Sequence, residues 1–140
     1  RLVFPRARVL HVRRHPMDTA LSMYLHSFSG SGVGYAYDLD DIGQYQRACD
    51  ELMAHWKRTA PIRIVDVQYE SLVREPEAGV RRLPDADGLD WDPRCLAFHR
   101  AERQVRTVSD WQVREPIHTR SVERWRRYEK YLAPIEKYLA

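Results

Sequence analysis

The most constraining feature of this sequence is a short apolar stretch that runs directly into two arginines and a proline. Residues 9–12 are apolar apart from His11, and Arg13, Arg14 and Pro16 follow at once. Such a stretch predicts a buried strand. A proline favours the first position of a helix, because its missing N–H would be unpaired there anyway. We therefore expect a strand, a tight turn and a helix, a unit typical of α/β proteins.

The start of the expected helix suits an anion. Free N–H groups and the positive end of the helix dipole meet there, and two guanidinium groups in the same turn favour a phosphate. Ser22 follows Asp18 by four residues, so both lie on the helix stripe that points toward Arg14. Arg14 and Ser22 could hold one phosphate between them. The plainer interpretation is an amphipathic helix with solvated arginines at its start.

Length and composition fit a single globular domain. The chain has 140 residues, of which 44% are hydrophobic and 31% charged, and no apolar run reaches transmembrane length. No signal-peptide pattern is present, so we expect a cytoplasmic protein without a membrane span. Cys49 and Cys95 lack neighbours with metal-ligand spacing. We expect them to be reduced, buried thiols.

Positive charge lies at the two ends of the chain. Residues 1–16 carry a net +5, residues 17–99 a net −6 and residues 100–140 a net +4, which together give +3. If the two ends meet in space, they form one anion site. A nucleic-acid-binding surface would present a longer basic stripe, and we expect no nucleic-acid partner.

The rest of the sequence predicts helices around a second strand. Asp38, Asp40 and Asp41 resemble a metal loop, but they lack the glutamate of a calcium loop, and helix N-capping explains them better. No metal site is expected. Apolar spacing, together with helix-breaking prolines, predicts strands at residues 8–12 and 62–69. It predicts helices at 16–28, 41–59, 76–83 and 93–99, a last helix from about Thr119 to a break at Pro134, and an acidic loop at 85–92. The core face of the helix at 41–59 would be formed by Ile42, Tyr45, Cys49, Leu52, Met53 and Trp56. A parallel pair of strands follows from this order.

Three segments, in this order, resemble the sulfotransferases that use 3′-phosphoadenosine 5′-phosphosulfate as donor. Residues 12–22 resemble the strand, turn and helix that bind the donor's 3′-phosphate, and residues 67–72 resemble the strand that ends in a Tyr-Glu pair. Residues 109–116 and 121–125 resemble the C-terminal loop and helix of the protein-tyrosine sulfotransferases and their bacterial, tetratricopeptide-linked relatives. Each motif is weak alone, but the three together are specific.

The resemblance implies a P-loop-NTPase-like three-layer α/β sandwich with a central parallel sheet. Residues 1–140 would be the C-terminal portion of that domain. The phosphosulfate-binding loop and the catalytic residues of the family would lie upstream of Arg1, so we expect this segment alone to be inactive. It would bind the 3′-phosphate and adenine side of the donor.

The resemblance also implies which residues bind the donor. Arg14, Ser22 and Arg124 would hold the 3′-phosphate, Tyr69 would contact adenine, and the closing loop would contribute Ser109, Gln112, Val113, Arg114 and His118. The donor is a co-substrate, and no metal is required. The acceptor would be a hydroxyl or amine of a carbohydrate, peptide, lipid or small alcohol, and a homodimer is compatible with the family. Surface ion pairing for the arginines and core packing for Tyr69 are the plainer roles.

Two alternatives stay open at this point. A P-loop kinase of a small metabolite would need an upstream G-x-x-x-x-G-K-[ST] loop and Mg²⁺. The other is a non-catalytic nucleotide- or anion-binding module; for a module that binds anionic glycans or RNA, binding would fall steeply with salt and would not depend on the donor nucleotide.

Overall fold

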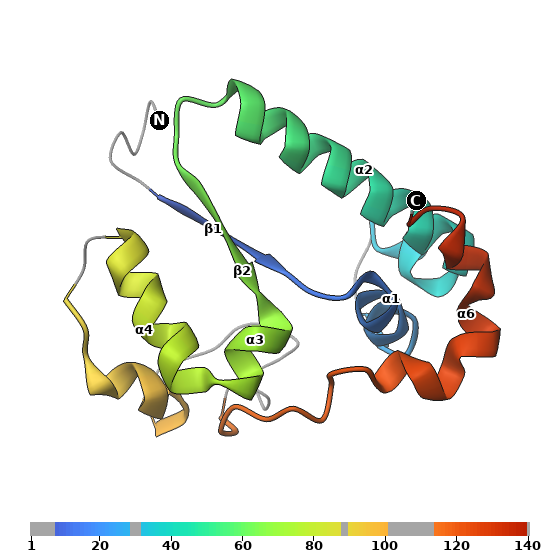
Figure 1. The fold of residues 1–140 in the computed structure, drawn as a ribbon. Helices are drawn as coiled ribbons and strands as arrows, with labels where there is room; N and C mark the ends of the chain where they lie inside the picture. Colours follow the sequence, from blue (N-terminus) through green and yellow to red (C-terminus); the bar gives the residue numbers. More distant parts are fainter. Residues whose placement is uncertain (1–7, 29–31, 88–89, 101–113, 140) are drawn as a thin grey trace.

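The computed structural model describes residues 8–28, 32–87, 90–100 and 114–139 (Figure 1). In these ranges two parallel strands, β1 (Val9–Arg13) and β2 (Ile64–Gln68), form a sheet in which Val9 lies opposite Ile64 and Arg13 opposite Gln68. The chain between them crosses over through helices, as a parallel pair requires. The expected parallel pair and the α/β class are confirmed, although β2 is shorter than the predicted strand at 62–69.

Helix α1 (Pro16–Tyr24) begins at the predicted proline and ends before the predicted residue 28. His15 is its N-cap, and the Nδ1 atom of His15 accepts a hydrogen bond from the Met17 N–H at 3.3 Å. Beyond α1, the Tyr37 hydroxyl accepts a hydrogen bond from the Phe28 N–H at 2.9 Å and donates one to the Phe28 carbonyl at 3.0 Å. These bonds hold residue 28 in a loop, which explains the early end of the helix.

The long helix α2 (Leu39–Thr59) follows a short 3₁₀ turn, η1 (Gly34–Tyr37). Asp38 is the N-cap of α2, and one of its carboxylate oxygens accepts the N–H groups of Asp40 and Asp41 at 2.8 and 3.1 Å. The N-capping role expected for this acidic cluster is confirmed at Asp38.

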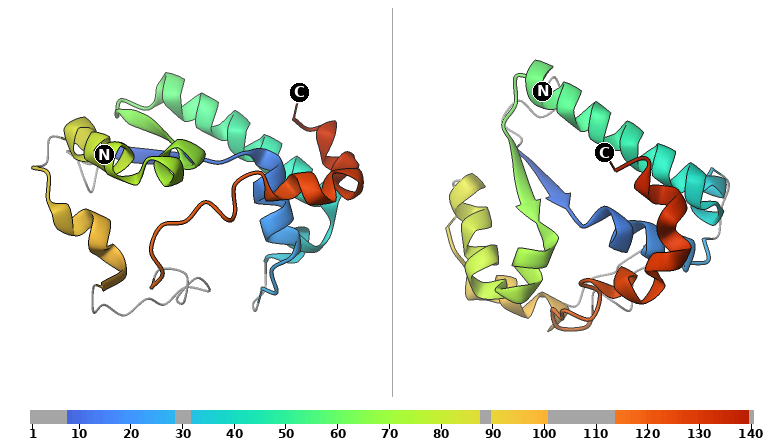
Figure 2. Two further views of the ribbon diagram at one scale, coloured as in Figure 1. Left: turned by 60° about the horizontal axis from the view of Figure 1, so that its bottom comes forward. Right: turned by 45° about the vertical axis from the view of Figure 1, so that its right-hand side comes forward.

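The predicted core face of α2 is wrong beyond its first turns. Ile42 is fully buried, but Tyr45, Leu52 and Trp56 are each about half exposed and Cys49 is exposed. The buried end of α2 packs against α1 and α6, and the helix then extends past both of them (Figure 2). Cys95 is exposed as well, so the expectation of buried thiols is wrong for both cysteines.

After β2 the chain forms α3 (Tyr69–Arg74), α4 (Pro76–Asp87) and the 3₁₀ segment η2 (Pro93–Arg100). The predicted helix at 76–83 is thus present but longer. The expectation of a loop from residue 85 is wrong for residues 85–87, which continue the helix. The predicted helix at 93–99 takes the tighter 3₁₀ form.

The C-terminal part returns to α1. The 3₁₀ helix η3 (Arg124–Tyr128) leads into α6 (Glu129–Glu136). The predicted helix start near Thr119 is therefore too early, and the predicted break at Pro134 is wrong, because Pro134 lies inside α6. The next residue, Ile135, is fully buried, so packing in the core holds the last turn of α6 in place.

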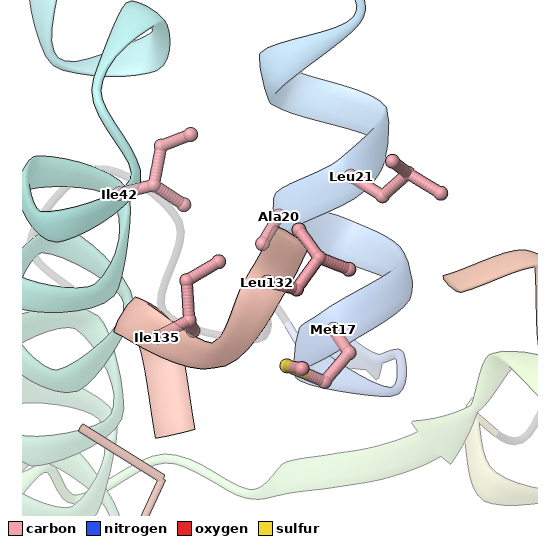
Figure 3. Close-up of a cluster of buried hydrophobic side chains, with 6 residues drawn as sticks. All are labelled: Met17, Ala20, Leu21, Ile42, Leu132 and Ile135. Atoms are coloured by element: carbon pink, nitrogen blue, oxygen red, sulfur yellow. The ribbon is translucent and has the colours of Figure 1, made fainter. Parts of the chain in front are cut away.

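The core lies where α1, α2 and α6 meet (Figure 3). Its buried side chains are Met17, Ala20, Leu21, Ile42, Leu132 and Ile135. This core joins α1 and α2 to the C-terminal helix α6 and places η3 beside α1 (Figure 2). None of the helices in the described ranges combines the length and apolar content needed to cross a membrane.

Candidate functional site

The turn between β1 and α1 is fixed by a carboxylate from the first turn of α3. Glu70, just after β2, accepts the backbone N–H of His15 at 2.8 Å and the side-chain amide of Gln68 at 2.5 Å. Burial raises the pKa of Glu70, but these hydrogen bonds and the nearby charge of Arg14 outweigh it and hold that pKa below its ordinary value. The Glu70 side chain thereby fixes the backbone from which Arg14 projects.

Arg14 links the β1–α1 turn to the segment before η3. One of its terminal nitrogens donates a hydrogen bond to the Ser121 carbonyl at 2.9 Å, and its guanidinium lies over the Tyr69 ring, 5.1 Å from the centroid. The Nε atom of Arg14 is buried and has no hydrogen-bond partner among the described residues. Since buried polar groups are nearly always paired, this donor is available to a ligand.

A buried carboxylate docks the C-terminal segment on α1. Asp18 is 1% exposed, and its two oxygens accept the backbone N–H groups of Glu123 at 2.7 Å and Trp125 at 2.9 Å. The Trp125 ring stacks on His15 with centroids 5.1 Å apart. Arg124 lies between the two anchored residues, so Asp18 sets the position of the Arg124 backbone. Asp18 also lies in the first turn of α1, where the helix dipole favours a carboxylate.

These contacts surround a cavity of about 760 Å³. It is lined by Arg14, Ser22, Tyr69, Val73, Phe98, Glu115, Pro116, Ile117, His118, Arg120, Ser121, Arg124 and Arg127. Five of the nine donor-binding residues expected from the sequence are in this set: Arg14, Ser22, Tyr69, His118 and Arg124. The structure therefore brings together side chains from α1, α3, η3 and the segment before η3.

The cavity is strongly basic. Four arginines line it, and Glu115 is the acidic residue of the lining. The Glu115 carboxylate is paired with Arg120 and lies 3.6 Å from the Nε2 atom of His118. The Nδ1 atom of His118 is buried and unpaired within the described ranges. Guanidinium groups in excess over carboxylates favour an anionic ligand, phosphate above all.

The remaining predicted residues lie elsewhere. Arg114 is exposed and does not line the cavity. Ser109, Gln112 and Val113 lie outside the described residues. Arg13, the neighbour of Arg14, does not line this cavity but lines a second one of about 610 Å³ beside α2, which Arg14 also lines.

Sequence reasoning missed Arg120 and Arg127 as lining residues. The spacing of Arg124 and Arg127 would have pointed to Arg127 if a 3₁₀ helix had been expected, since residues three apart then share a face. Within the described ranges, His, Cys, Asp and Glu residues form no group of three or more suited to a metal ion.

Comparison with known proteins identifies the family to which this chain belongs. A protein of Aquifex aeolicus (strain VF5), described as uncharacterized, is 40% identical over 136 residues, which is 96% of this chain and 18% of that protein. The chain thus spans less than a fifth of the length of that relative. A comparison with protein families matches residues 1–93 to the sulfotransferase family, and this match includes β1, α1, β2 and α3. Since 93 of the 140 residues match, the chain belongs to the sulfotransferase family.

Proposed function

We propose that this chain forms the donor-binding side of a sulfotransferase that uses 3′-phosphoadenosine 5′-phosphosulfate. One observation carries the proposal: Arg14 and Ser22, from the β1–α1 turn and α1, line the same basic cavity as Arg124, which lies in the distant helix η3. Tyr69 lies in the same lining, under the Arg14 guanidinium. Cationic and hydroxyl donors that line one cavity suit a phosphate monoester.

In this proposal the cavity residues bind and orient the nucleotide. Arg14 and Arg124 provide charge and forked N–H donors for the 3′-phosphate, and Ser22 provides a hydroxyl donor. Tyr69 presents a ring to adenine. The buried Nδ1 atom of His118, which has no hydrogen-bond partner among the described residues, can bond the ligand. Ser109, Gln112, Val113 and Arg114 remain proposed loop contacts.

The proposed reaction is a direct sulfuryl transfer. An acceptor hydroxyl or amine attacks sulfur, a new O–S or N–S bond forms, and the bond from sulfur to the 5′-phosphate oxygen breaks. Adenosine 3′,5′-bisphosphate leaves, and the acceptor proton passes to a base. Holding the nucleotide in one position lowers the barrier by removing rotational and translational freedom before the transfer.

Several finer points belong to the same proposal. The motif order supports the bacterial, protein-tyrosine-sulfotransferase-like branch and a P-loop-like three-layer sandwich of which residues 1–140 are the C-terminal portion. The phosphosulfate-binding loop and the base would lie on chain outside this segment. A carbohydrate, peptide, lipid or small alcohol as acceptor, a homodimer and a cytoplasmic location stay predictions.

The test is the affinity of the full chain for adenosine 3′,5′-bisphosphate, measured by calorimetry for the wild type, Arg14→Ala and Arg13→Ala. Charge-assisted hydrogen bonds contribute about 1.5–3 kcal/mol, so Arg14→Ala should weaken binding roughly 10- to 100-fold. Arg13→Ala removes the same charge from the second cavity and should change the affinity little. Equal losses in both variants, or no binding by the wild type, would contradict the proposal.

A chelator separates this proposal from the kinase alternative. Sulfuryl transfer by the complete enzyme should continue when divalent cations are removed, because the proposed chemistry uses no metal. Transfer that stops in the chelator and returns with Mg²⁺ would favour a kinase-like nucleotide site.

A further inference from the structure

Two arginines of η3 share one face of that helix. A 3₁₀ helix has three residues per turn, so the side chains of residues i and i+3 lie one above the other. Arg124 and Arg127 have this spacing, and both line the basic cavity. Arg126, between them in sequence, is not part of the lining.

The charges of these two arginines are not compensated by acidic groups in the described ranges, where neither Arg124 nor Arg127 makes an ion pair or a hydrogen bond through its side chain. The nearby carboxylates have other partners. Glu115 pairs with Arg120, and Glu123 lies 3.5 Å from Arg126 and 3.6 Å from Arg74. Two like charges on one helix face repel each other unless an anion lies between or beside them.

The face that carries the pair is held in a fixed position. Asp18 accepts the N–H groups on both sides of Arg124, and the Trp125 ring stacks on His15. The backbone of η3 is therefore set before any ligand arrives, and such preorganisation lowers the entropic cost of binding.

We propose that Arg127 is a third phosphate-binding arginine, the second on η3, and that it acts with Arg124 on the same phosphate. This inference rests on the proposed function, in which that phosphate is the 3′-phosphate of the donor. The pair makes the cavity select nucleotides that carry a 3′-phosphate over those that lack one. Arg126 has the same charge and lies on the same turn, but contributes nothing to this selection.

The test compares adenosine 3′,5′-bisphosphate with adenosine 5′-monophosphate on the full chain. Arg127→Ala should weaken binding of the bisphosphate about 10-fold and that of the monophosphate less than about 3-fold. Arg126→Ala is the matched control and should change neither affinity. Arg127→Lys keeps the charge but loses the forked donors, so it should fall between the wild type and Arg127→Ala.

The outcomes separate this inference from the proposed function. If the wild type binds the bisphosphate and Arg14→Ala weakens it, but Arg127→Ala behaves like Arg126→Ala, the role of Arg127 is wrong and the proposed function stands. If the wild type does not distinguish the two nucleotides, both are overturned. Since Arg127 is exposed, its substitution leaves the fold intact, and an unchanged near-ultraviolet circular dichroism spectrum checks this.

Discussion

Arg14 and Ser121 are 107 positions apart in the sequence, yet the Arg14 guanidinium donates a hydrogen bond of 2.9 Å to the Ser121 carbonyl. This bond connects the turn after β1, which suits a phosphate, to the segment that leads into η3. It leaves the buried Nε atom of Arg14 without a partner among the described residues. The bond therefore orients the Arg14 guanidinium while its Nε–H donor stays available to a ligand.

Asp18 should contribute to both stability and nucleotide binding. Asp18→Asn replaces one oxygen that accepts a backbone N–H with an amide that cannot accept it. Losing one charge-assisted hydrogen bond should lower the free energy of unfolding by about 2 kcal/mol in urea denaturation. It should also weaken the affinity for adenosine 3′,5′-bisphosphate, because Arg124 loses its anchor. The control is Asp41→Asn, at an exposed position in the first turn of α2. Equal stability of the two variants would contradict the docking role of Asp18.

Glu70 should make stability depend on pH in the acid range. The pKa of Glu70 in the folded protein is below its ordinary value. In an unfolded chain that ordinary value is about 4.3. Its stabilising contribution is thus complete above that unfolded value and is lost as the pH falls through the lower, folded value. Glu70→Gln keeps an oxygen for the His15 N–H and should flatten this part of the curve of unfolding free energy against pH. An unchanged curve would show that Glu70 does not contribute.

Tyr69 should act through its ring, since the Arg14 guanidinium lies over the ring face. A cation–π contact contributes about 0.5–2 kcal/mol, so Tyr69→Ala should weaken nucleotide binding roughly 3- to 30-fold. Tyr69→Phe retains the ring and should bind nearly as well as the wild type in the same titration. A loss in Tyr69→Phe as large as that in Tyr69→Ala would assign the role to the hydroxyl instead.

Two positions on α2 should differ sharply in their effect on stability. Ile42 is fully buried, and Ile42→Ala should lower the free energy of unfolding by about 2–5 kcal/mol. Leu52 belongs to the same predicted apolar stripe but is 53% exposed, so Leu52→Ala should cost less than about 0.5 kcal/mol. Denaturant unfolding of both variants decides this, and similar losses would mean that the far half of α2 is covered in solution.

Local signals in the sequence predicted the local structure well. Pro16 marks the start of α1, Asp38 caps α2, and the β-branched run before Gln68 forms β2. These features depend on a few neighbouring residues. Arg14, in the turn before α1, and Ser22, within α1, line one cavity, as the strand–turn–helix motif predicted.

Long-range contacts could not be predicted in this way. Apolar periodicity shows that α2 has an apolar face, but not how far a partner covers it, and Tyr45 and Trp56 proved to be half exposed. Nothing near Asp18 in the sequence indicates that its carboxylate binds the backbone at residues 123 and 125. The participation of Arg127 depends on a 3₁₀ turn that propensity alone does not distinguish from an α-helix.

The central claim is that Arg14 and Arg124 hold the same phosphate, and a double-mutant cycle tests it most directly. The affinities of the wild type, Arg14→Ala, Arg124→Ala and the double variant are measured for adenosine 3′,5′-bisphosphate and adenosine 5′-monophosphate. We predict that each single substitution weakens the bisphosphate at least about 10-fold and the monophosphate less than about 3-fold, with a coupling of at least about 0.5 kcal/mol for the bisphosphate. Losses that are additive and equal for the two nucleotides would contradict the claim.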